Sequence, residues 1–518
     1  EKELSLKFKL NYLKNGYLIM QTENNPFKGC KAIVEGEGFV GREEQINELN
    51  SHIFDKNFDN VAIVGIPHIG KSSLMNTLYL KRKELWTDKR NLVVWHTLKK
   101  VNKDDNYHRF DLFLSIASQV YSKLKKLCPN DDFIEDLAEY MDILTEKDIR
   151  WFEFEANLKN FFETIVDNNI RVITCLDEFD YAKDYLQEAE YQLLRELSYV
   201  PSYRVALITT SRRSIYDIEH YSGGGSNLFM LFENIYLKPF TKMEHCLQCK
   251  KIPFINECDI DKLWSITGGH PFINSILLEK YWTTKDVNKA LFQAKQLIYK
   301  YYDDLFYVLK KDGLDDKVDR LYCGYTEGVT EQQRDYIYNR YGIFIFQKDE
   351  SYIPFSSIFE DYLKCRYKNI PFADVWPETE RALRKSISSA LAKHFNTKDY
   401  TTWVAGLSFI DDIPKDRLNV WKGQMHAEKT KYGAAGSPNI INQLYPKDFQ
   451  IFFKLFWDEC LSDIYGKDLF YWLNALSFIA DDIRNPFAHS RKGLLSEKEQ
   501  LKATLICQEI IDCVIRKK

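Results

Sequence analysis

Two stretches of the chain carry the residue types that phosphate chemistry requires. Residues 61–64 are apolar, and they are followed by the sequence Gly65-x-x-x-x-Gly70-Lys71-Ser72-Ser73. This spacing is that of a phosphate-binding P-loop between a strand and a helix. Backbone N–H groups of such a loop, the helix N-terminus and the lysine bind phosphate oxygens, and the serine hydroxyl binds Mg²⁺. The pattern therefore predicts a site for ATP or ADP with Mg²⁺.

A second apolar run, residues 171–176, ends in Asp177 and Glu178. An acidic pair at the end of a strand is typical of ATP hydrolysis. We predict that Asp177 holds Mg²⁺ through water and that Glu178 orients or deprotonates the attacking water.

A third apolar run, residues 204–208, ends in Thr209-Thr210-Ser211-Arg212. The hydroxyl groups are expected to contact the γ-phosphate or the attacking water, and Arg212 is expected to sense charge there. The alternative is a cationic strand end that forms ordinary salt bridges. Three such strand ends predict an α/β fold with a doubly wound parallel sheet, whose ligand lies at the carboxyl ends of the strands.

A different polar cluster lies near the other end of the chain, in the sequence Arg484-Asn485-Pro486-Phe487-Ala488-His489. On a continuous helix Arg484 and His489 would lie about 140° apart. Pro486 should end the helix near Ile483, which lets Arg484, Asn485 and His489 converge. An arginine that neutralises a phosphodiester and a histidine that moves protons are suited to metal-independent RNA cleavage. The alternative is a polar turn that ends a helix with a cation.

The bulk properties are those of a folded protein of several domains. Its 518 residues are too many for one core, so roughly three or four domains are expected. The net charge of −4 excludes a global basic field, so any nucleic-acid site must be a local patch, such as Arg491 and Lys492 after the polar cluster. Scattered cysteines in apolar segments indicate reduced thiols in the cytoplasm, and no apolar run approaches the ~18 residues of a membrane span.

The remaining elements can be read from periodicity and turn residues. A β-hairpin is expected around Asn15-Gly16, and helices over about 100–165. Strands around the turn 348–351, followed by a helix, are typical of the end of a winged helix. Helices are expected over 378–395, 446–465 and 467–483, and from Ser496, where Ser496-x-x-Glu499 forms a capping box. The sequence His245-Cys246-x-x-Cys249, with Cys258, favours buried thiols over a zinc site.

Several motifs together resemble the STAND/AAA-like ATPases, a group close to origin-recognition ATPases. They are the P-loop, the Asp177-Glu178 pair, and the segments 38–49, 237–244 and 264–278. The resemblance covers residues 25–365 and implies that Val40, Gly41 and Arg42 lie by the adenine and ribose. It also implies that the turn Gly268-Gly269-His270-Pro271 brings a helical lid, including Pro271, onto the base.

The tail resembles HEPN domains of the Arg-Asn-x-x-x-His type. The similarity includes the polar cluster, an aromatic helix pair before it, and a helix containing Glu380, Leu383, Arg384 and Ile387. Family members generally dimerise so that two such turns form one ribonuclease cleft. Others serve only as dimerisation or antitoxin modules.

These observations predict a hairpin segment at 1–28, an NTPase core at 29–236, a lid at 237–290, a winged helix at 291–366 and a HEPN domain at 367–518. The expected function is an ATP-regulated ribonuclease in antiphage defence or a toxin. Its expected partners are an RNA substrate and further copies of itself, and no membrane is expected. Since no sensor repeats are found, a separate protein, a nucleic acid or the helices of 100–165 would sense the trigger. One alternative is an ATPase regulator whose HEPN domain is not catalytic. Another is an initiator-like ATPase that reads DNA with its winged helix.

Overall fold

A computed structural model describes twelve stretches of the chain. They are residues 25–29, 33–54, 59–98, 110–184, 186–223, 225–324, 326, 328–348, 351–367, 372–433, 439–484 and 495–515. The expected hairpin around Asn15-Gly16, the residues Asn485 and His489, and the patch Arg491-Lys492 lie outside the described residues. The chain divides into two compact units, Glu1–Tyr301 with Arg340–Gly342 and Tyr302–Asn339 with Ile343–Lys518. Each is described by itself.

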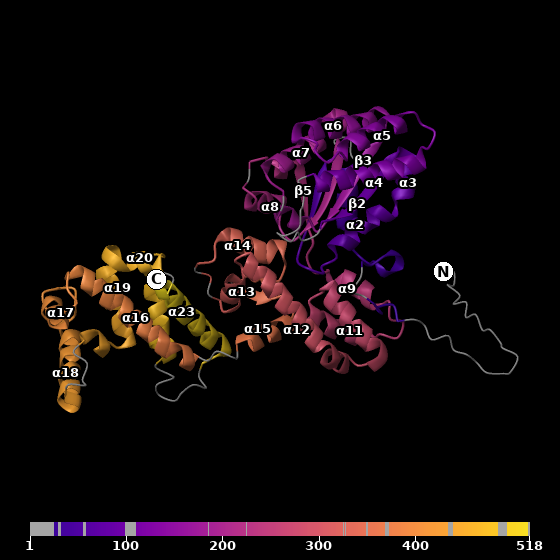
Figure 1. Cartoon of the computed structure of the whole chain (residues 1–518). Coiled ribbons are helices and arrows are strands. Elements are labelled where there is room, and N and C mark those ends of the chain that lie inside the picture. The colour runs from indigo at the N-terminus through magenta and orange to yellow at the C-terminus, as the bar shows by residue number, and fades with distance from the viewer. Residues whose placement is uncertain are drawn as a thin grey trace. The chain divides into compact units, whose positions relative to one another are not determined.

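The first unit is built on a five-stranded parallel sheet with helices on both sides (Figure 1). Its strands are β1 (Asn60–Val64), β2 (Asn91–Thr97), β3 (Arg171–Asp177), β4 (Val205–Ser211) and β5 (Phe232–Tyr236), in the order β2-β3-β4-β1-β5. All four pairings are parallel. The α/β fold predicted from the three strand-end motifs is confirmed, and β4 separates the P-loop strand from the acidic strand.

Helices connect these strands and bury the sheet. They are α1 (Glu43–Phe54), α2 (Lys71–Leu80), α3 (Arg82–Lys89), α4 (Asp111–Leu127), α5 (Phe133–Leu144), α6 (Trp151–Asp167), α7 (Glu188–Tyr199) and α8 (Ile215–Tyr221), with short 3-10 turns η1 (Gly36–Gly38), η2 (Phe179–Asp184), η3 (Pro201–Tyr203) and η4 (Leu228–Leu231). Helices α4, α5 and α6 follow β2 and precede β3, so the predicted helical insertion is present. Their apolar faces join the same core as the strands, as the burial of Phe113, Leu137 and Phe154 shows.

Four helices follow the sheet, three in the region predicted to be a lid and a fourth that continues into the segment predicted as a winged helix. They are α9 (Lys242–Cys249), α10 (Glu257–Thr267), α11 (Pro271–Thr284) and α12 (Val287–Lys311). Thr241 caps α9 with a reciprocal bond to Glu244, and Gly268 ends α10 in the left-handed conformation with φ 56°. Buried thiols were expected here; Cys249 is buried and Cys246 half-buried, but Cys258 is exposed. In the described part of the chain no group of three or more metal-ligating side chains occurs.

The second unit begins with short helices and a two-stranded ladder. Its elements are α13 (Asp315–Tyr322), α14 (Glu331–Asp335), the π-helix η5 (Tyr336–Arg340), β6 (Phe344–Phe346), β7 (Tyr352–Pro354) and α15 (Ser357–Tyr367). Strands β6 and β7 are antiparallel and are followed by a helix, as expected. One face of that helix, α15, is buried through Ile358, Phe359 and Tyr362. Assignment of this region as a winged helix stays a prediction.

The tail of the second unit is helical. Its elements are α16 (Phe372–His394), α17 (Tyr400–Leu407), α18 (Lys415–Tyr432), η7 (Ile440–Gln443), η8 (Pro446–Asp448), α19 (Phe449–Phe456), η9 (Trp457–Leu461), α20 (Ser462–Tyr465), α21 (Leu469–Ser477), η10 (Phe478–Arg484) and α23 (Glu497–Ile515). Helix α16 packs along α23. Three buried tryptophans, Trp403, Trp421 and Trp472, contribute to the core.

Two features of the tail differ from expectation. Helix α16 begins at Phe372 rather than at 378 and contains Pro377. The buried side chains of Phe372 and Val375 stabilise this additional turn, which outweighs the single hydrogen bond that a proline removes. Helices α17 and α18 were not predicted, since α18 has little apolar periodicity. At the other end, Ser496 and Glu499 form the predicted capping box of α23.

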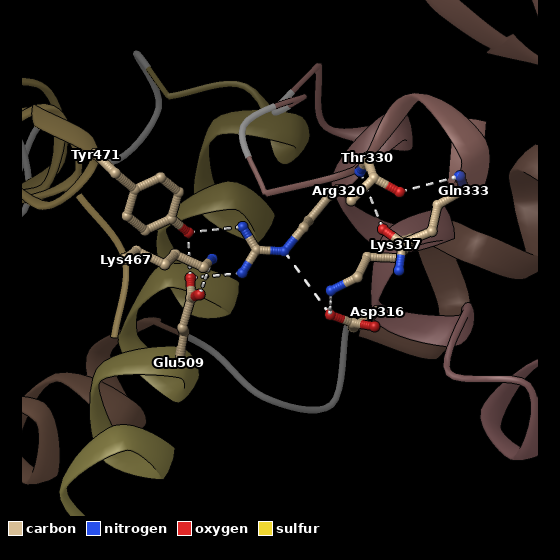
Figure 2. A network of polar contacts seen from close by, with 8 residues as sticks. All are labelled: Asp316, Lys317, Arg320, Thr330, Gln333, Lys467, Tyr471 and Glu509. Carbon is tan, nitrogen blue, oxygen red and sulfur yellow. Dashed lines mark hydrogen bonds and ion pairs between the residues drawn. The ribbon is translucent and has the colours of Figure 1, made fainter. Parts of the chain in front are cut away.

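A buried polar network ties α13 to α21 and α23 within the second unit (Figure 2). The guanidinium of Arg320, only 5% exposed, donates to Tyr471 Oη at 2.8 Å and to Glu509 Oε2 at 2.5 Å. Lys467 and Tyr471 also bind the Glu509 carboxylate. Burial alone would raise the pKa of Glu509, but the charge of Arg320 and the hydrogen bonds hold it below its usual value. This buried ion pair therefore connects the segment predicted as a winged helix to the helical tail.

Replacing Glu509 by glutamine is expected to destabilise the second unit by about 3 kcal/mol, because it removes the close buried partner of Arg320 and leaves only the half-exposed Asp316, at 3.9 Å. Hydrogen–deuterium exchange of the α23 amides measures the effect. Glu378→Gln, which changes an exposed carboxylate on α16, is the control and should leave exchange unchanged. Equal exchange in Glu509→Gln and wild type would contradict the role of the network.

Candidate nucleotide site

The loop between β1 and α2 has the geometry that a P-loop requires. A Cβ at Gly65 would lie 2.8 Å from the backbone oxygen of Leu237, so only glycine allows this close approach. Gly70 precedes α2 with φ 107°, in the left-handed region that favours glycine. The loop therefore needs glycine at both positions for conformational reasons. The N-terminus of α2, with Ser72 and Ser73 in its first turn, faces the loop.

Lys71 folds into the loop itself. Its Nζ donates to the backbone oxygens of Gly65 and Ile66 at 2.8 and 3.0 Å. Burial lowers the pKa of the ammonium group to about 8, against the opposing effects of Asp180, Asp177 and Glu178. The Lys71 ammonium is thus held at the centre of the loop. Its pKa of about 8 means that it begins to lose its proton in mildly alkaline solution.

Asp177, at the end of β3, binds the end of β4 and the first turn of α2. Its Oδ1 accepts from Ser72 Oγ at 2.9 Å and from Thr210 Oγ1, which extends from β4 between β1 and β3. Two hydroxyl oxygens and a carboxylate at one place form the oxygen-rich set that Mg²⁺ prefers. The residues present therefore fit the expected metal. Thr210 was expected to contact phosphate, whereas here it binds the acidic residue.

Glu178 follows directly in a constrained conformation. Its φ of 58° lies in the left-handed region, which is uncommon for a residue with a side chain. Its N–H donates to Thr210 Oγ1 at 3.1 Å, which holds it in place. Burial raises the pKa of the carboxyl, and the charge of Asp177 acts in the same direction. A carboxylate with raised pKa is a better base for activating water.

A third carboxylate was not singled out from the sequence. Asp180 is 7% exposed and accepts from the backbone N–H of Arg212 at 2.6 Å, and the guanidinium Nε of Arg212 lies 3.6 Å from the same oxygen. Arg212 also lies near enough to Lys71 to lower its pKa. The structure thus places the predicted charge sensor next to both an acid and the P-loop cation. The signal in the sequence was a second aspartate, three residues after Asp177.

The segment Val40-Gly41-Arg42, expected near the base, packs against the lid. The Arg42 guanidinium is 5% exposed, donates to the backbone oxygens of Lys238 and Ile69 at 2.7 and 3.3 Å, and lies over the ring of Phe240. Its backbone N–H donates to Glu244 Oε1 at 2.6 Å. Arg42 therefore connects the P-loop to the segment 238–244, which leads into the lid helices. A contact of Val40, Gly41 or Arg42 with adenine stays a prediction.

The turn before α11 brings the lid to the P-loop. A Cβ at Gly269 would lie 2.5 Å from the backbone oxygen of Phe240, so this position needs glycine. Pro271 begins α11, and the next residue, Phe272, stacks on His68 of the P-loop at 4.4 Å between ring centroids. Tyr301 Oη donates to the backbone oxygen of Pro67 at 3.1 Å. These P-loop contacts were not predicted, because residues far apart in the sequence form them.

The tail cluster is described only at its start. Arg484 is the last residue of η10 and is half-buried. Asn485 and His489 lie outside the described residues, so their convergence with Arg484 stays a prediction. The predicted end of the helix near Ile483 therefore also stays a prediction.

No family model matches the chain. The GTPase Der of Karelsulcia muelleri (strain GWSS) is 24% identical over 197 residues, which are 34% of this chain and 42% of the relative. The chain thus spans less than half the length of this curated relative.

Three solved structures are similar over longer stretches. A Walker-type ATPase of Pyrococcus abyssi is 15% identical, with 65% of this chain and 99% of that chain covered and a TM-score of 0.46. Cdc6p from Pyrobaculum aerophilum is 15% identical, with 65% and 100% covered and a TM-score of 0.31. A STAND protein with a tetratricopeptide repeat sensor from Pyrococcus horikoshii is 17% identical, with 92% and 67% covered and a TM-score of 0.30.

These TM-scores are too low to establish a shared fold. The assignment of the first unit as an α/β P-loop NTPase fold therefore depends on its strand order, its P-loop and the contacts of Asp177. Within the described residues, no helix combines the length and apolar character needed to cross a membrane.

The affinity for ATP is expected to fall as pH rises above about 8. Phosphate binding needs protonated Lys71, whose pKa in the free protein is about 8. Below that pH the ammonium is already charged, so affinity is constant, and above it each pH unit weakens binding by up to about tenfold. Titrations with a fluorescent ATP analogue from about pH 7 to about pH 9 measure this. In Lys71→Arg the guanidinium stays charged, and equal pH dependence in this variant would contradict the assignment.

Proposed function

We propose that the chain is a nucleotide-regulated ATPase. The observation that carries the proposal is the convergence of Ser72, Thr210 and Asp177 at the mouth of the P-loop. A chance glycine turn does not explain why hydroxyl groups from two further elements bind the acidic residue of a third. The contacts between the P-loop and the lid support regulation, because a phosphate bound in the loop would affect Pro67 and His68.

The protein's own residues supply most of the expected chemistry. Lys71 and the N–H groups of the loop bind the β- and γ-phosphates, and Ser72 and Asp177 hold Mg²⁺ directly or through water. When bound, the cation neutralises charge that develops on the phosphate oxygens. Glu178 orients the attacking water and accepts its proton, and Thr210 fixes the Glu178 backbone while it does so. Arg212 responds to charge at the γ-phosphate and is held by Asp180 until then.

Phosphate release from ATP with Mg²⁺ tests this proposal. We expect release by the wild type and a loss of it in Lys71→Ala, which removes the P-loop cation. Lys83→Ala, on the exposed surface of α3, is the matched control. Hydrolysis at the wild-type rate in Lys71→Ala would overturn the assignment of the site.

We further propose that the tail is an RNA-cleaving HEPN domain that the ATPase controls. The proposal is supported by the sequence Arg484-Asn485-Pro486-Phe487-Ala488-His489 after an aromatic helix pair, and by the helical unit in which η10 ends at Arg484. Arg484 is assigned to the phosphodiester, and His489 to proton transfer. Two copies of the chain would supply the two halves of one cleft, and a separate trigger protein would set the ATPase state.

Reading of duplex DNA by the segment β6–β7 is not favoured. Its exposed positions include Ile345, Phe346 and Ile353, which are 40–44% exposed and apolar. Backbone phosphates bind cationic side chains, and in the described part of this segment only Lys348 provides one. Cleavage assays on Arg484→Ala and His489→Ala distinguish a ribonuclease from a tail that serves only for dimerisation.

A further inference from the structure

Helix α18 is an unusual element of the second unit, because beyond its first half only Met425 packs against the core, and no side chain there is fully buried. Of its 18 residues, only Leu418 and Trp421, both in its first half, are buried. Figure 1 shows α18 extending away from the neighbouring helices of the tail. Most helices in proteins are stabilised by an apolar face that packs on a core. The exposed length of α18 therefore calls for another explanation.

One face of α18 carries regularly spaced lysines. Lys415, Lys422 and Lys429 are seven residues apart, so successive ones lie within about 20° of each other around the axis and span about 21 Å along it. We refer to these three residues as the cationic stripe. The acidic residues of α18, Asp416 and Glu428, are each adjacent in sequence to a lysine of the stripe and therefore point about 100° away.

The cationic stripe is not used to stabilise the fold by ion pairs. Within the stretches that the structure describes, none of the three lysines forms an ion pair, and the Lys422 ammonium donates to Ser408 Oγ at 2.7 Å. Lys415 and Lys429 are exposed. By contrast, Arg417 of the same helix is engaged with a carboxylate on another element. The stripe is a local positive surface on a chain whose net charge is −4.

The base of α18 is firmly anchored. Asp448, 1% exposed, accepts from Arg417 Nε at 2.9 Å and from Trp421 Nε1 at 2.8 Å. The neighbouring residue of η8, Lys447, contacts η10, the element that ends at Arg484. Its Nζ lies 3.1 Å from Oδ1 of Asp481, three residues before Arg484. The stripe and Arg484 therefore belong to elements joined through η8.

We propose that the cationic stripe of Lys415, Lys422 and Lys429 binds the phosphate backbone of single-stranded RNA and holds it for the tail. The inference rests on the proposed ribonuclease. Charge complementarity favours a polyanion, and the link through η8, where Asp448 binds α18 and Lys447 binds Asp481 of η10, favours RNA over an acidic protein. The stripe has no hydrogen-bonding groups beyond its ammonium groups, so binding is independent of base sequence.

Salt dependence of RNA binding by the full chain tests the proposal. His489→Ala is present in every sample so that RNA stays intact, and the probe is a fluorescent single-stranded oligouridylate. Each phosphate contact on a single strand contributes about 0.7 to the slope of log affinity against log salt concentration. The variant Lys415→Gln/Lys422→Gln/Lys429→Gln is expected to bring the slope about 2 closer to zero. Glutamine favours helix, so α18 is retained, and equal far-ultraviolet circular dichroism confirms it.

The matched control is Lys83→Gln/Lys125→Gln/Lys126→Gln, which removes three exposed lysines of the first unit and should leave the slope unchanged. An unchanged slope in the stripe variant would overturn the proposal and leave the stripe a solvated face. An equally large loss of polyglutamate binding would also overturn it, in favour of an acidic protein partner. A shifted slope, combined with intact RNA in a separate reaction of the chain with unchanged His489, ATP and Mg²⁺, would refute the ribonuclease while retaining the RNA site.

Discussion

Replacing Glu178 by glutamine is expected to slow ATP hydrolysis by about 10²–10⁴-fold while ATP still binds. The N–H of Glu178 is held by Thr210 Oγ1 at 3.1 Å, and burial raises the pKa of its carboxyl. Glutamine keeps the size and the backbone contacts of the residue but cannot accept a proton. Single-turnover phosphate release, with a parallel measurement of nucleotide affinity, separates the two effects.

Glu139→Gln provides the control, since Glu139 is an exposed carboxylate on α5 of the same unit. It should hydrolyse ATP at the wild-type rate. If Glu178→Gln also retained that rate, Glu178 would not be the base. A loss of ATP binding in Glu178→Gln would indicate instead that the residue stabilises the loop.

The second large effect is expected in the tail. Replacing His489 by alanine should slow RNA cleavage by about 10²–10⁴-fold, because the imidazole is assigned to proton transfer. Arg484→Ala should lose cleavage as well, since the arginine is assigned to the phosphodiester charge. Gel analysis of labelled RNA incubated with ATP and Mg²⁺ measures both.

His394→Ala is a suitable comparison, because His394 lies in the same unit and is partly exposed, in contact with Glu459. An exposed contact of this kind contributes little to stability. RNA cleavage by His489→Ala at the rate of His394→Ala would show that the tail cluster is not a ribonuclease site.

The sequence predicted the parts of the nucleotide site that depend on local pattern. The glycines of the P-loop, Lys71 and the strand-end carboxylates have fixed spacings, and their strand–loop–helix context can be recognised without a structure. The sheet class followed from three apolar runs with polar ends. Strands β2 and β5 were not identified, because a short apolar run without a polar motif at its end resembles many other segments.

What the sequence could not predict depends on contacts between distant segments. Thr210 donates a hydrogen bond to Asp177 because β4 lies between β1 and β3. The order of strands in a sheet has no local signature in the sequence. The stacking of His68 on Phe272 joins residues about 200 positions apart in the chain. Helix α18 was missed because its apolar residues lie near one end and the rest of its surface is polar.

Tertiary packing also explains why α16 begins before residue 378. A proline usually marks a helix boundary, and residue 378 was the expected start. Burial of Phe372 and Val375 on the preceding turn supplies more stability than the missing hydrogen bond costs. Tertiary packing outweighed a local signal, which only the structure could show.

The most direct test of the central claim is RNA cleavage by the full chain with and without ATP and Mg²⁺, in wild type and in Lys71→Ala. Nucleotide control of the tail predicts cleavage by the wild type only when ATP is present, and none by Lys71→Ala under either condition. Intact RNA in the wild-type reaction with ATP, or equal cleavage by Lys71→Ala, would contradict an ATPase that controls a ribonuclease.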